Sequence, residues 1–452
     1  MALKVPRLVV AGSGSGSGKT TAVCALLRAL GERGVSTAAF KCGPDYIDPM
    51  FHRRLTKAGG NLDPFFFSDD TLNYLLEKHG AGRALSVIEG VMGYYDGLGL
   101  SDRASTYTVA RATASPVALL LNARGAALSL VAALEGFVNF RPDANIRGVI
   151  FNRCPPSLYP ALAGAVRERF GERVLPLGYL PPMPDCALES RHLGLVTAEE
   201  VGRLDGILDR LGAQAARSLD LDAIEAIAAG APPPRFAPPA LPEAGERLRI
   251  AVARDRAFCF YYGDSLALLE DMGAELAPFS PLSDAALPEG AQGLYLGGGY
   301  PELYAGELSA NVPMRSAVFE AVARRRVPCI AECGGFMYLT REIGGLPMAG
   351  ALPGTCRDTG HLARFGYISL RAKRDNLLCR AGEAIPAHEF HHWDCDRPGE
   401  DFSAEKPNGR RWDCAVATDS LYAGFPHFHF YARPDFAANF CRACRKGARS
   451  HG

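Results

Sequence analysis

The run VAGSGSGSGKTTAV, from Val10 to Val23, combines glycines, a lysine and threonines at a spacing that suits phosphate binding. Glycines let backbone N–H groups approach an anion, the lysine can reach terminal phosphates, and the next hydroxyl can bind Mg²⁺. Apolar RLVV precedes the run, and TTAVCALLRAL follows it with apolar residues at helical spacing, which favours a phosphate loop over a flexible Gly/Ser linker. Gly12 stands six residues before Gly18, so we interpret the loop as a variant of the common form. The residues predicted to bind the nucleotide are Gly12, Gly14, Gly16, Ser17, Gly18, Lys19, Thr20, Thr21 and, for the base, Asn152 at the end of VIFN.

Acidic residues follow two further strand-like segments. Asp45 and Asp48 lie in KCGPDYIDP, and Glu89 and Asp96 lie in SVIEGVMGYYDG. Open α/β sheets bind ligands beyond the carboxyl ends of their strands, so we expect these acids near the phosphates. Because Mg²⁺ prefers hard oxygen ligands, the predicted metal ligands are Thr20, Asp45 and Glu89. Asp48 and Asp96 are predicted to order an incoming carboxylate substrate.

A thiol stands at a sharp turn in VPCIAECGGFMYLTREI. An apolar strand leads into Cys333 and its two following glycines, and apolar residues then follow at helical spacing, at Phe336, Met337, Leu339 and Ile343. This is the pattern of a nucleophile elbow, with Cys333 as the nucleophile. A helix N-terminus lowers a thiol's pKa, and the N–H of Gly334 can face a developing oxyanion. The second oxyanion donor is expected from LGGGYPE, at Gly298 and Gly299.

A cysteine nucleophile needs a base, and YAGFPHFHFYARP offers two histidines in a segment of strand character. We expect His427 to be the base. Strand alternation puts His429 on the same face, so it is left open as an orienting residue or a substitute base. The cluster AHEFHHWDCD, with His388, His391 and His392, lacks the H-E-x-x-H order and is interpreted as a substrate or domain contact.

These residues need strands and helices that position them. Strand-like LVVAG, STAAFKCG, ALSVIEG, PVALLLN, IRGVIFNR and RVLPLGYLP alternate with helix-like segments, which predicts a mostly parallel sheet with helices on both faces. Proline-rich AGAPPPRFAPPALPEAGER is typical of a linker, and LRIAVARD then starts a second α/β unit. The predicted domains are residues 1–228 and 248–452, joined by a linker at 229–247.

Composition narrows the function classes. Lys plus Arg and Asp plus Glu both number 49 in 452 residues, so no global field would gather nucleic acid or a membrane surface. No apolar run suits a signal peptide or a membrane span. Thirteen scattered cysteines fit reduced thiols, and the close pair Cys441 and Cys444 lacks the second pair of a zinc site. We therefore expect a cytoplasmic protein with no nucleic-acid or membrane partner.

In combination these motifs resemble the cobyrinic acid a,c-diamide synthase family, glutamine-dependent amidotransferases of corrinoid biosynthesis. The resemblance covers nearly the whole chain and is carried by VPRLVVAGSGSGSGKTT, KCGPDYIDP, IEGVMGYYDG, RHLGLV, IAVARDRAFCFYY, LGGGYPELYA, AECGGFMYL, AHEFHHWD and PHFHF. It implies a dethiobiotin synthetase-like P-loop domain that activates a carboxylate with ATP and Mg²⁺. A class I glutamine amidotransferase domain would follow and release ammonia. The implied partners are small molecules, namely a corrinoid tetrapyrrole, glutamine and ATP, with a homodimer as the expected assembly.

A tetrapyrrole with several carboxylates suits scattered arginines and flat apolar surfaces. The candidates are Tyr46, Arg191, His192, Arg254 and the aromatic run Phe258, Phe260, Tyr261 and Tyr262, which a buried core would explain equally well. The chain also departs from the family pattern twice. Many class I relatives have a glutamate where this chain has His429, which leaves the third triad member open. The usual His-Tyr-Ser after HEF is here His391-His392-Trp393, which alters the expected substrate pocket.

Two other functions fit the same motifs. A synthase acting on nickel-sirohydrochlorin or hydrogenobyrinic acid would use the same chemistry, and the sequence does not distinguish it. The alternative of another class is a P-loop switch ATPase with an inactive amidotransferase-like domain. The partitioning type of switch carries an extra lysine early in its loop, and residues 12–17 contain none.

Overall fold

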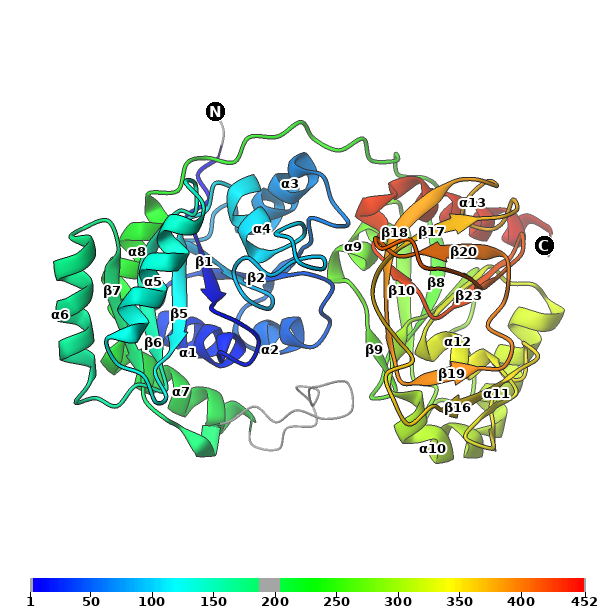
Figure 1. The fold of residues 1–452 in the computed structure, drawn as a ribbon. Coiled ribbons are helices and arrows are strands. Elements are labelled where there is room, and N and C mark those ends of the chain that lie inside the picture. The colour runs from blue at the N-terminus through cyan, green and yellow to red at the C-terminus, as the bar shows by residue number, and fades with distance from the viewer. Residues whose placement is uncertain (1–2, 187–203, 451–452) are drawn as a thin grey trace. The chain divides into compact units, whose positions relative to one another are not determined.

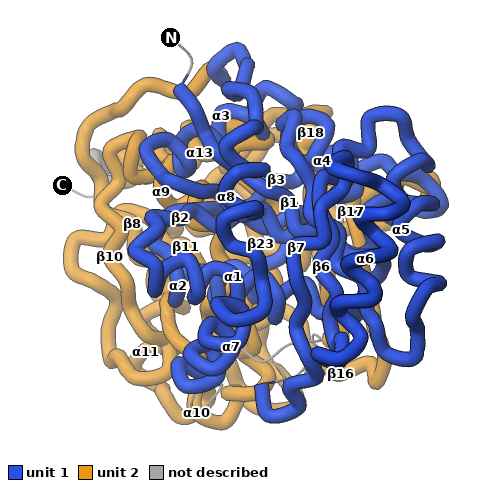
Figure 2. The backbone as a smooth tube through the Cα atoms, turned by 90° about the vertical axis from the view of Figure 1, so that its left-hand side faces the viewer, with its two compact units in different colours: residues 1–239 blue, residues 240–452 orange. Residues whose placement is uncertain are grey.

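The computed structural model describes residues 3–186 and 204–450 (Figure 1). The chain forms two compact units, which Figure 2 colours separately. Unit 1 comprises residues 1–239 and unit 2 comprises residues 240–452.

The boundary between the units falls inside the proline-rich stretch that the sequence indicated as a linker. Between the end of α8 (Leu221–Ala229) and the start of β8 (Leu248–Ala253), the backbone forms neither helix nor strand. The bounds 1–228, 229–247 and 248–452 stay a prediction.

Unit 1 is built on a seven-stranded sheet in the order β3-β2-β4-β1-β5-β6-β7, and every neighbouring pair is parallel. The predicted parallel α/β sheet is thus confirmed. Central strands such as β1 and β2 are buried along their whole length, because both faces of the sheet are covered. The strands are β1 (Arg7–Gly12), β2 (Thr37–Cys42), β3 (Ala58–Leu62), β4 (Leu85–Glu89), β5 (Val117–Asn122), β6 (Ile146–Asn152) and β7 (Leu175–Leu180).

Helices fill the connections between these strands. One apolar core joins α1, α7 and α8 to the face of the sheet that carries Leu8 and Val10, while Val9 is buried on the opposite face. The helices are α1 (Lys19–Glu32), α2 (Asp48–Leu55), α3 (Asp69–Gly80), α4 (Thr106–Ala112), α5 (Ser129–Phe140), α6 (Tyr159–Phe170), the 3₁₀ turn η1 (Pro184–Cys186), α7 (Leu204–Ser218) and α8.

Strand β3, with the sequence AGGNL, is a strand that the sequence did not predict. Glycine weakens a strand pattern and usually marks a close backbone approach. Here Gly59 has φ 143°, and a Cβ on it would lie 1.7 Å from the carbonyl oxygen of Ala39 in β2. The glycine is therefore required where β3 joins the edge of the sheet.

Unit 2 contains a second, six-stranded sheet in the order β10-β8-β11-β13-β23-β22. Its first five strands are parallel and β22 is antiparallel to β23. The strands after β8 are β10 (Ala274–Phe279), β11 (Gly293–Leu296), β13 (Cys329–Glu332), β22 (Val416–Ala417) and β23 (Leu421–Gly424). The helices of the unit are α9 (Gly263–Asp271), η2 (Pro301–Tyr304), α10 (Ala305–Ala310), α11 (Val312–Phe319), the π-helical η3 (Glu320–Arg324), α12 (Gly334–Leu339), η4 (Phe430–Ala432) and α13 (Pro434–Ser450).

Three further sheets complete unit 2. The largest is antiparallel, in the order β21-β20-β17-β18-β24, and the others are β12-β9 and β15-β14-β16-β19. Their strands are β9 (Phe258–Phe260), β12 (Gly298–Gly299), β14 (Glu342–Ile343), β15 (Leu346–Pro347), β16 (Thr355–Asp358), β17 (Arg364–Ala372), β18 (Ala384–His391), β19 (Trp393–Cys395), β20 (Phe402–Glu405), β21 (Arg411–Cys414) and β24 (His427–Phe428).

The helix after the thiol is shorter than its apolar spacing predicted. α12 ends at Leu339, and Ile343 lies in strand β14. Gly344 and Gly345, both at positive φ, form the tight turn of the β14–β15 hairpin. Such a turn requires left-handed backbone, so the glycines outweigh the helical apolar pattern.

Two expectations from the composition concern reduced cysteines and membrane-spanning helices. All thirteen cysteines are free, as expected of reduced thiols. Within the described part of the chain, no helix is both long and apolar enough to cross a membrane.

The first prediction concerns Gly59. A Gly59→Ala change should lower the free energy of unfolding by about 1–3 kcal/mol, because the methyl group meets the backbone of β2 and the φ value is unfavourable. Gly31→Ala in α1 is the matched control, since nothing lies within 4 Å of a Cβ there and alanine should stabilise a helix by about 0.5–1 kcal/mol. Urea unfolding followed by circular dichroism measures both, and equal stability of the two variants would contradict the assignment.

Candidate active sites

The phosphate loop has the backbone that its glycines suggested. It joins β1 to α1, and Gly16 and Gly18 adopt left-handed φ values of 73° and 89°. A Cβ on Gly12 would lie 2.2 Å from Oγ of Ser17, so the loop folds back closely on the end of β1. Gly14 has open space where a Cβ would stand, and Thr21 is half-buried in the first turn of α1.

Asn152, at the end of β6, braces this loop. Its Nδ2 donates to the carbonyl oxygen of Ser17 at 2.8 Å, and its Oδ1 accepts from the N–H of Arg153 at 3.0 Å. A Cβ on Gly18 would lie 2.3 Å from the same Nδ2. Contact with a nucleotide base stays a prediction, whereas the support of the loop is a feature of the fold.

Lys19 begins α1 and is almost buried. Its Nζ donates to the carbonyl oxygens of Met92 at 2.5 Å and Gly14 at 3.2 Å. Burial, with the nearby charge of Lys41, lowers its pKa to about 8. A lysine held in this way is poised to exchange backbone oxygens for phosphate oxygens.

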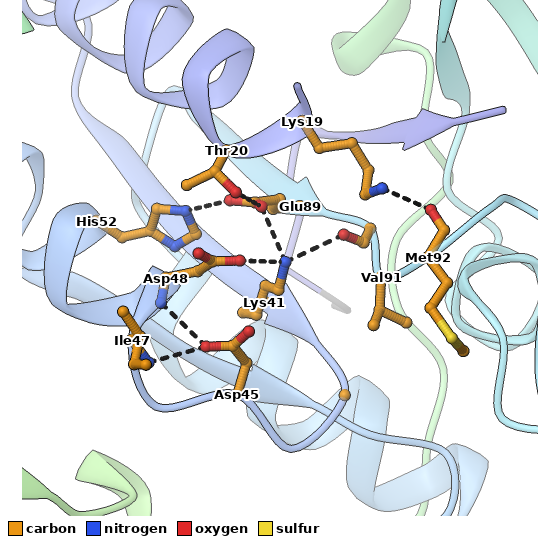
Figure 3. Close-up of polar contacts among 12 residues, drawn as sticks. Lys19, Thr20, Lys41, Asp45, Ile47, Asp48, His52, Glu89, Val91 and Met92 are labelled. Atoms are coloured by element: carbon orange, nitrogen blue, oxygen red, sulfur yellow. Dashed lines mark hydrogen bonds and ion pairs between the residues drawn. The ribbon is translucent and has the colours of Figure 1, made fainter. Parts of the chain in front are cut away.

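Glu89, at the end of β4, is the centre of a buried polar cluster (Figure 3). Its Oε1 accepts from Oγ1 of Thr20 at 2.7 Å and from Nζ of Lys41 at 2.8 Å, and its Oε2 lies 2.7 Å from Nε2 of His52. Lys41 also pairs with Oδ2 of Asp48 at 2.5 Å. Side chains from β2, α1 and α2 therefore meet at one carboxylate.

The charged groups of this cluster shift one another's pKa values. Burial alone would lower the pKa of Lys41, but the carboxylates of Asp48 and Glu89 raise it well above its usual value. Burial alone would raise the pKa of Glu89, but Lys41 and His52 lower it overall. Burial raises the pKa of Asp48, whose Oδ1 has no hydrogen-bond partner among the described residues. The cluster thus presents a buried oxygen that can accept a ligand.

Asp45 and Asp96 order backbone beside the cluster. Oδ1 of Asp45 accepts from the N–H groups of Ile47 and Asp48 at 2.8 and 3.0 Å, which shapes the start of α2. Oδ2 of Asp96 accepts from the N–H of Gly93 at 2.9 Å. Thr20 contacts Glu89 directly, and Lys41 joins Glu89 to Asp48. Asp45 has a different set of hydrogen-bond partners.

The nucleophile elbow lies between β13 and α12 in unit 2. Cys333 has φ 48°, a left-handed conformation that costs a non-glycine residue energy. Its N–H donates to the carbonyl oxygen of Gly424 at 2.7 Å. A Cβ on Gly334 would lie 3.1 Å from the backbone N of Gly299, so the two predicted oxyanion donors lie close together.

The thiol's pKa differs from the sequence-based expectation. Burial raises the pKa of Cys333 well above its usual value, and the nearby Glu302 carboxylate adds to the rise. The N–H of Gly334 acts in the opposite direction but is the smaller effect. A helix of only six residues does not offset the loss of water around the sulfur. The thiol therefore needs a partner that takes its proton.

His427 lies beside the oxyanion glycines. A Cβ on Gly298 would stand 2.5 Å from Cε1 and 3.3 Å from Nε2 of this histidine. Its Nδ1 lies 3.1 Å from Oε2 of Glu332, the residue before the nucleophile. His427 is buried, and burial lowers its pKa to about 3.

His429 has other partners. Strand β24 ends at Phe428, and His429 caps η4 by accepting the N–H of Tyr431 at its Nδ1, at 3.2 Å. Its ring packs 4.6 Å from the ring of Tyr262. The short strand thus replaces the longer one that the sequence suggested.

The remaining candidates divide between core, surface and undescribed chain. The rings of His388 and His427 lie 5.3 Å apart, and His391 stacks on Phe425 at 4.0 Å. Arg254 is exposed at the end of β8, whereas Tyr46 is buried in unit 1. Arg191 and His192 lie outside the described residues. The aromatic run is buried in the core of unit 2, which favours the structural alternative for Phe258, Phe260, Tyr261 and Tyr262.

Family models and curated relatives match both units. Among solved structures, a glutamine amidotransferase from Thermotoga maritima covers 45% of this chain and 85% of its own, at 11% identity and a TM-score of 0.30. Residues 8–195 match the CobQ/CobB/MinD/ParA nucleotide binding domain, and residues 249–435 match the CobB/CobQ-like glutamine amidotransferase domain. The cobyrinate a,c-diamide synthase of Listeria monocytogenes serotype 4b is 38% identical over 94% of this chain and 96% of that protein. That of Synechococcus is 37% identical over 97% and 98%. The chain belongs to the cobyrinate a,c-diamide synthase family.

In this member of the family, sequence reasoning missed three polar residues that the sites contain. Lys41 and His52 contact Glu89, and Glu332 contacts His427. Lys41 and Glu332 each stand at the end of an apolar strand, where a charged residue must find a partner. The position of each charged residue at a strand end could be seen in the sequence. The identity of its partner, however, depends on which strands are neighbours in the sheet.

The second prediction tests the role of Lys41 in this family member. Lys41→Met should lower the free energy of unfolding by about 3–5 kcal/mol, because two buried carboxylates lose their cation. Adding Asp48→Asn should restore part of the loss. Lys373→Met, which breaks an exposed pair with Asp413, is the control and should change stability by less than about 1 kcal/mol. A double variant as unstable as the single one would contradict the charge balance.

Proposed function

We propose that the chain uses ATP and glutamine to convert the a and c side-chain carboxylates of cobyrinic acid to amides, in cobalamin biosynthesis. The observation that carries this proposal is the presence, in one chain of this family, of a phosphate loop beside buried acids and of a cysteine elbow beside a histidine. The first site suits phosphate activation of a carboxylate, and the second suits release of ammonia from an amide. Relatives over nearly the full length carry the name cobyrinate a,c-diamide synthase.

Unit 1 would activate the carboxylate. A carboxylate oxygen attacks the terminal phosphorus of ATP, the bond to the bridging oxygen breaks, and ADP leaves with the bonding electron pair. Ammonia then attacks the acyl phosphate, phosphate leaves, and a proton is lost to give the amide. The loop N–H groups and Lys19 would hold the phosphates, and catalysis at such a site consists of positioning and charge stabilisation.

Lys41 supports the same site. The charge of Lys41 lowers the pKa of Lys19, so the two ammonium groups lie within electrostatic range of each other. Nζ of Lys41 is itself engaged by Asp48, by Glu89 and by the carbonyl oxygen of Gly90. We therefore assign Lys41 to holding the two carboxylates in place beside the phosphate loop.

The same residues fit a magnesium ion. Thr20 offers a hydroxyl next to the carboxylate of Glu89, and Asp48 offers its buried Oδ1, which has no hydrogen-bond partner within the described part of the chain. These are hard oxygen donors of the kind that Mg²⁺ takes. The residues that would hold it are thus Thr20, Glu89 and Asp48, with Asp45 as the further candidate from the sequence. When bound, the ion would neutralise phosphate charge.

Unit 2 would supply the ammonia. His427 takes the proton of the Cys333 thiol at Nε2, the sulfur attacks the side-chain amide carbon of glutamine, and an oxyanion forms near the N–H groups of Gly334 and Gly299. The carbon–nitrogen bond breaks, and the amine leaves as ammonia with the proton from Nε2. Water then hydrolyses the thioester to glutamate and frees the thiol.

The proposal also covers contacts with the macrocycle, the assembly and the cellular location. Arg191, Arg254 and Tyr46 are offered as contacts for the macrocycle. A homodimer and a cytoplasmic location stay predictions from the sequence. A nucleotide switch with an inert second unit would release no glutamate, so glutamate release separates the two functions.

The third prediction separates the two half-reactions. Cys333→Ala should lower glutamine-dependent amidation by at least about 1,000-fold and keep the activity with high ammonium, because unit 1 does not use the thiol. Cys259→Ala, at a partly exposed thiol, is the control and should keep both activities. The measurement is amide formation on cobyrinic acid with each nitrogen source. Loss of the ammonium activity in Cys333→Ala would mean that the nucleophile or the division of labour is misassigned.

The fourth prediction concerns the phosphate loop. Lys19→Ala should abolish ATP-dependent amidation with both glutamine and ammonium, because the lysine acts on the phosphates whichever nucleophile follows. Lys4→Ala, at an exposed lysine, is the matched control. ADP release is measured under saturating substrate, and normal turnover of Lys19→Ala would rule out the assignment.

A further inference from the structure

His427 needs a group that fixes its ring and its tautomer, and the family pattern left that group open. We infer that Glu332 is the positioning residue for His427, holding the proton on Nδ1 so that Nε2 is the base for Cys333. Oε2 of Glu332 lies 3.1 Å from Nδ1 of His427. The inference deepens the proposed glutaminase function and rests on it.

The sheet of unit 2 explains why these two residues meet. In the parallel pairing of β13 with β23, Glu332 lies opposite Gly424. The chain reaches His427 only three residues after Gly424, at the start of β24. The residue before the nucleophile and the base therefore lie at the same end of neighbouring strands.

Both sides of the His427 ring are constrained. On one side, Glu332 is held by a second contact, because the hydroxyl of Tyr295 in β11 donates to its Oε1 at 3.4 Å. On the other side, only the missing side chain of Gly298 leaves room for the Cε1–Nε2 edge. Glu332 and His427 are 1% and 3% exposed, so water does not compete for Nδ1. The ring thus presents Nε2 to the glycines of the predicted oxyanion site.

His429, the alternative orienting residue, is engaged elsewhere. Its Nδ1 accepts the N–H of Tyr431, and its ring packs against Tyr262. These contacts hold the imidazole as the cap of η4. The carboxylate of Glu332 is the acidic group that the structure places at Nδ1 of His427.

The charge state of this pair predicts a pH dependence. Burial raises the pKa of Glu332 to about 8 and lowers that of His427 to about 3. The base-competent form has Glu332 ionised and His427 neutral with its proton on Nδ1, so it accumulates as pH rises toward the pKa of Glu332. His427 contacts Glu332 directly, and the titratable groups whose pKa the charge of Glu332 affects are Tyr261, Tyr295, Cys333 and Tyr422.

The test measures glutamate release from glutamine by the full chain over a pH series. Glu332→Gln should lower kcat by at least about 100-fold with little change in KM. The rise of kcat/KM toward the pKa of Glu332 should also move to lower pH, because no carboxyl has to ionise. Glu332→Asp keeps the ionisable group and should give an intermediate kcat with that rise retained. Glu307→Gln, at an exposed glutamate paired with Arg256, is the matched control and should behave as wild type.

Three outcomes are distinguishable. If wild type releases glutamate and Glu332→Gln keeps kcat within about threefold, the inference is overturned. It is also overturned if Glu332→Gln loses activity but keeps the wild-type pH profile, because a purely structural role would have that effect. If wild type itself releases no glutamate, the proposed function fails first and the inference with it. Urea unfolding followed by circular dichroism, measured in parallel, shows that each variant is folded.

Discussion

Parallel strands end at one edge of a sheet, and this constraint determines where both sites lie. A residue that ends a buried strand meets the residues that end its neighbours, whatever their distance in the sequence. In unit 1 the strand ends bring together Gly12, Lys41 and Glu89. In unit 2 they bring Glu332 beside the turn that carries His427. The helices and the antiparallel sheet hold these edges in place and contribute few of the reacting groups.

The two sites treat buried charge in opposite ways. In unit 1, Lys41 is flanked by Asp48 and Glu89. The pKa of Lys41 is raised and that of Glu89 is lowered, so these two groups keep their charges, whereas burial raises the pKa of Asp48. In unit 2, burial drives Glu332, His427 and Cys333 toward their neutral forms. Phosphate transfer calls for fixed charges that need no rearrangement during the step. Thiol chemistry requires proton transfer between side chains. Groups that are driven toward their neutral forms can exchange protons with little reorganisation of their surroundings.

Much of the fold could be predicted because the seven-stranded sheet of unit 1 and the first five strands of the six-stranded sheet of unit 2 are parallel. Continuous apolar segments predicted β1, β2, β4, β5, β6 and β7, and the glycine loop predicted the strand–helix turn before Lys19. β3 was missed because its AGGNL sequence has a weak strand signal, and the need for Gly59 is explained by the carbonyl of Ala39 in the neighbouring strand. The end of α12 was missed because the apolar spacing continued through Ile343 into a hairpin.

The sites were predicted in their residue types but less well in their partnerships. Glu89, Lys19 and Cys333 were recognised because each stands beside glycines or at a strand end. His427 was recognised as a histidine in a strand-like segment downstream of the thiol. Lys41 and Glu332 lie within the same motifs, but the sequence analysis assigned them no role. Their contacts depend on the order of strands in the sheet, which a single sequence does not encode as a local pattern. The same reason explains why His429 was paired with His427 from alternation alone.

The left-handed backbone at Cys333 has a consequence for how such a protein changes over time. A side chain at that φ costs roughly 1–3 kcal/mol, and glycine would remove the cost. Selection for stability alone would therefore favour loss of the nucleophile at this position. A copy of the gene in an organism supplied with free ammonia would be expected to drift toward a more stable protein with a silent second unit.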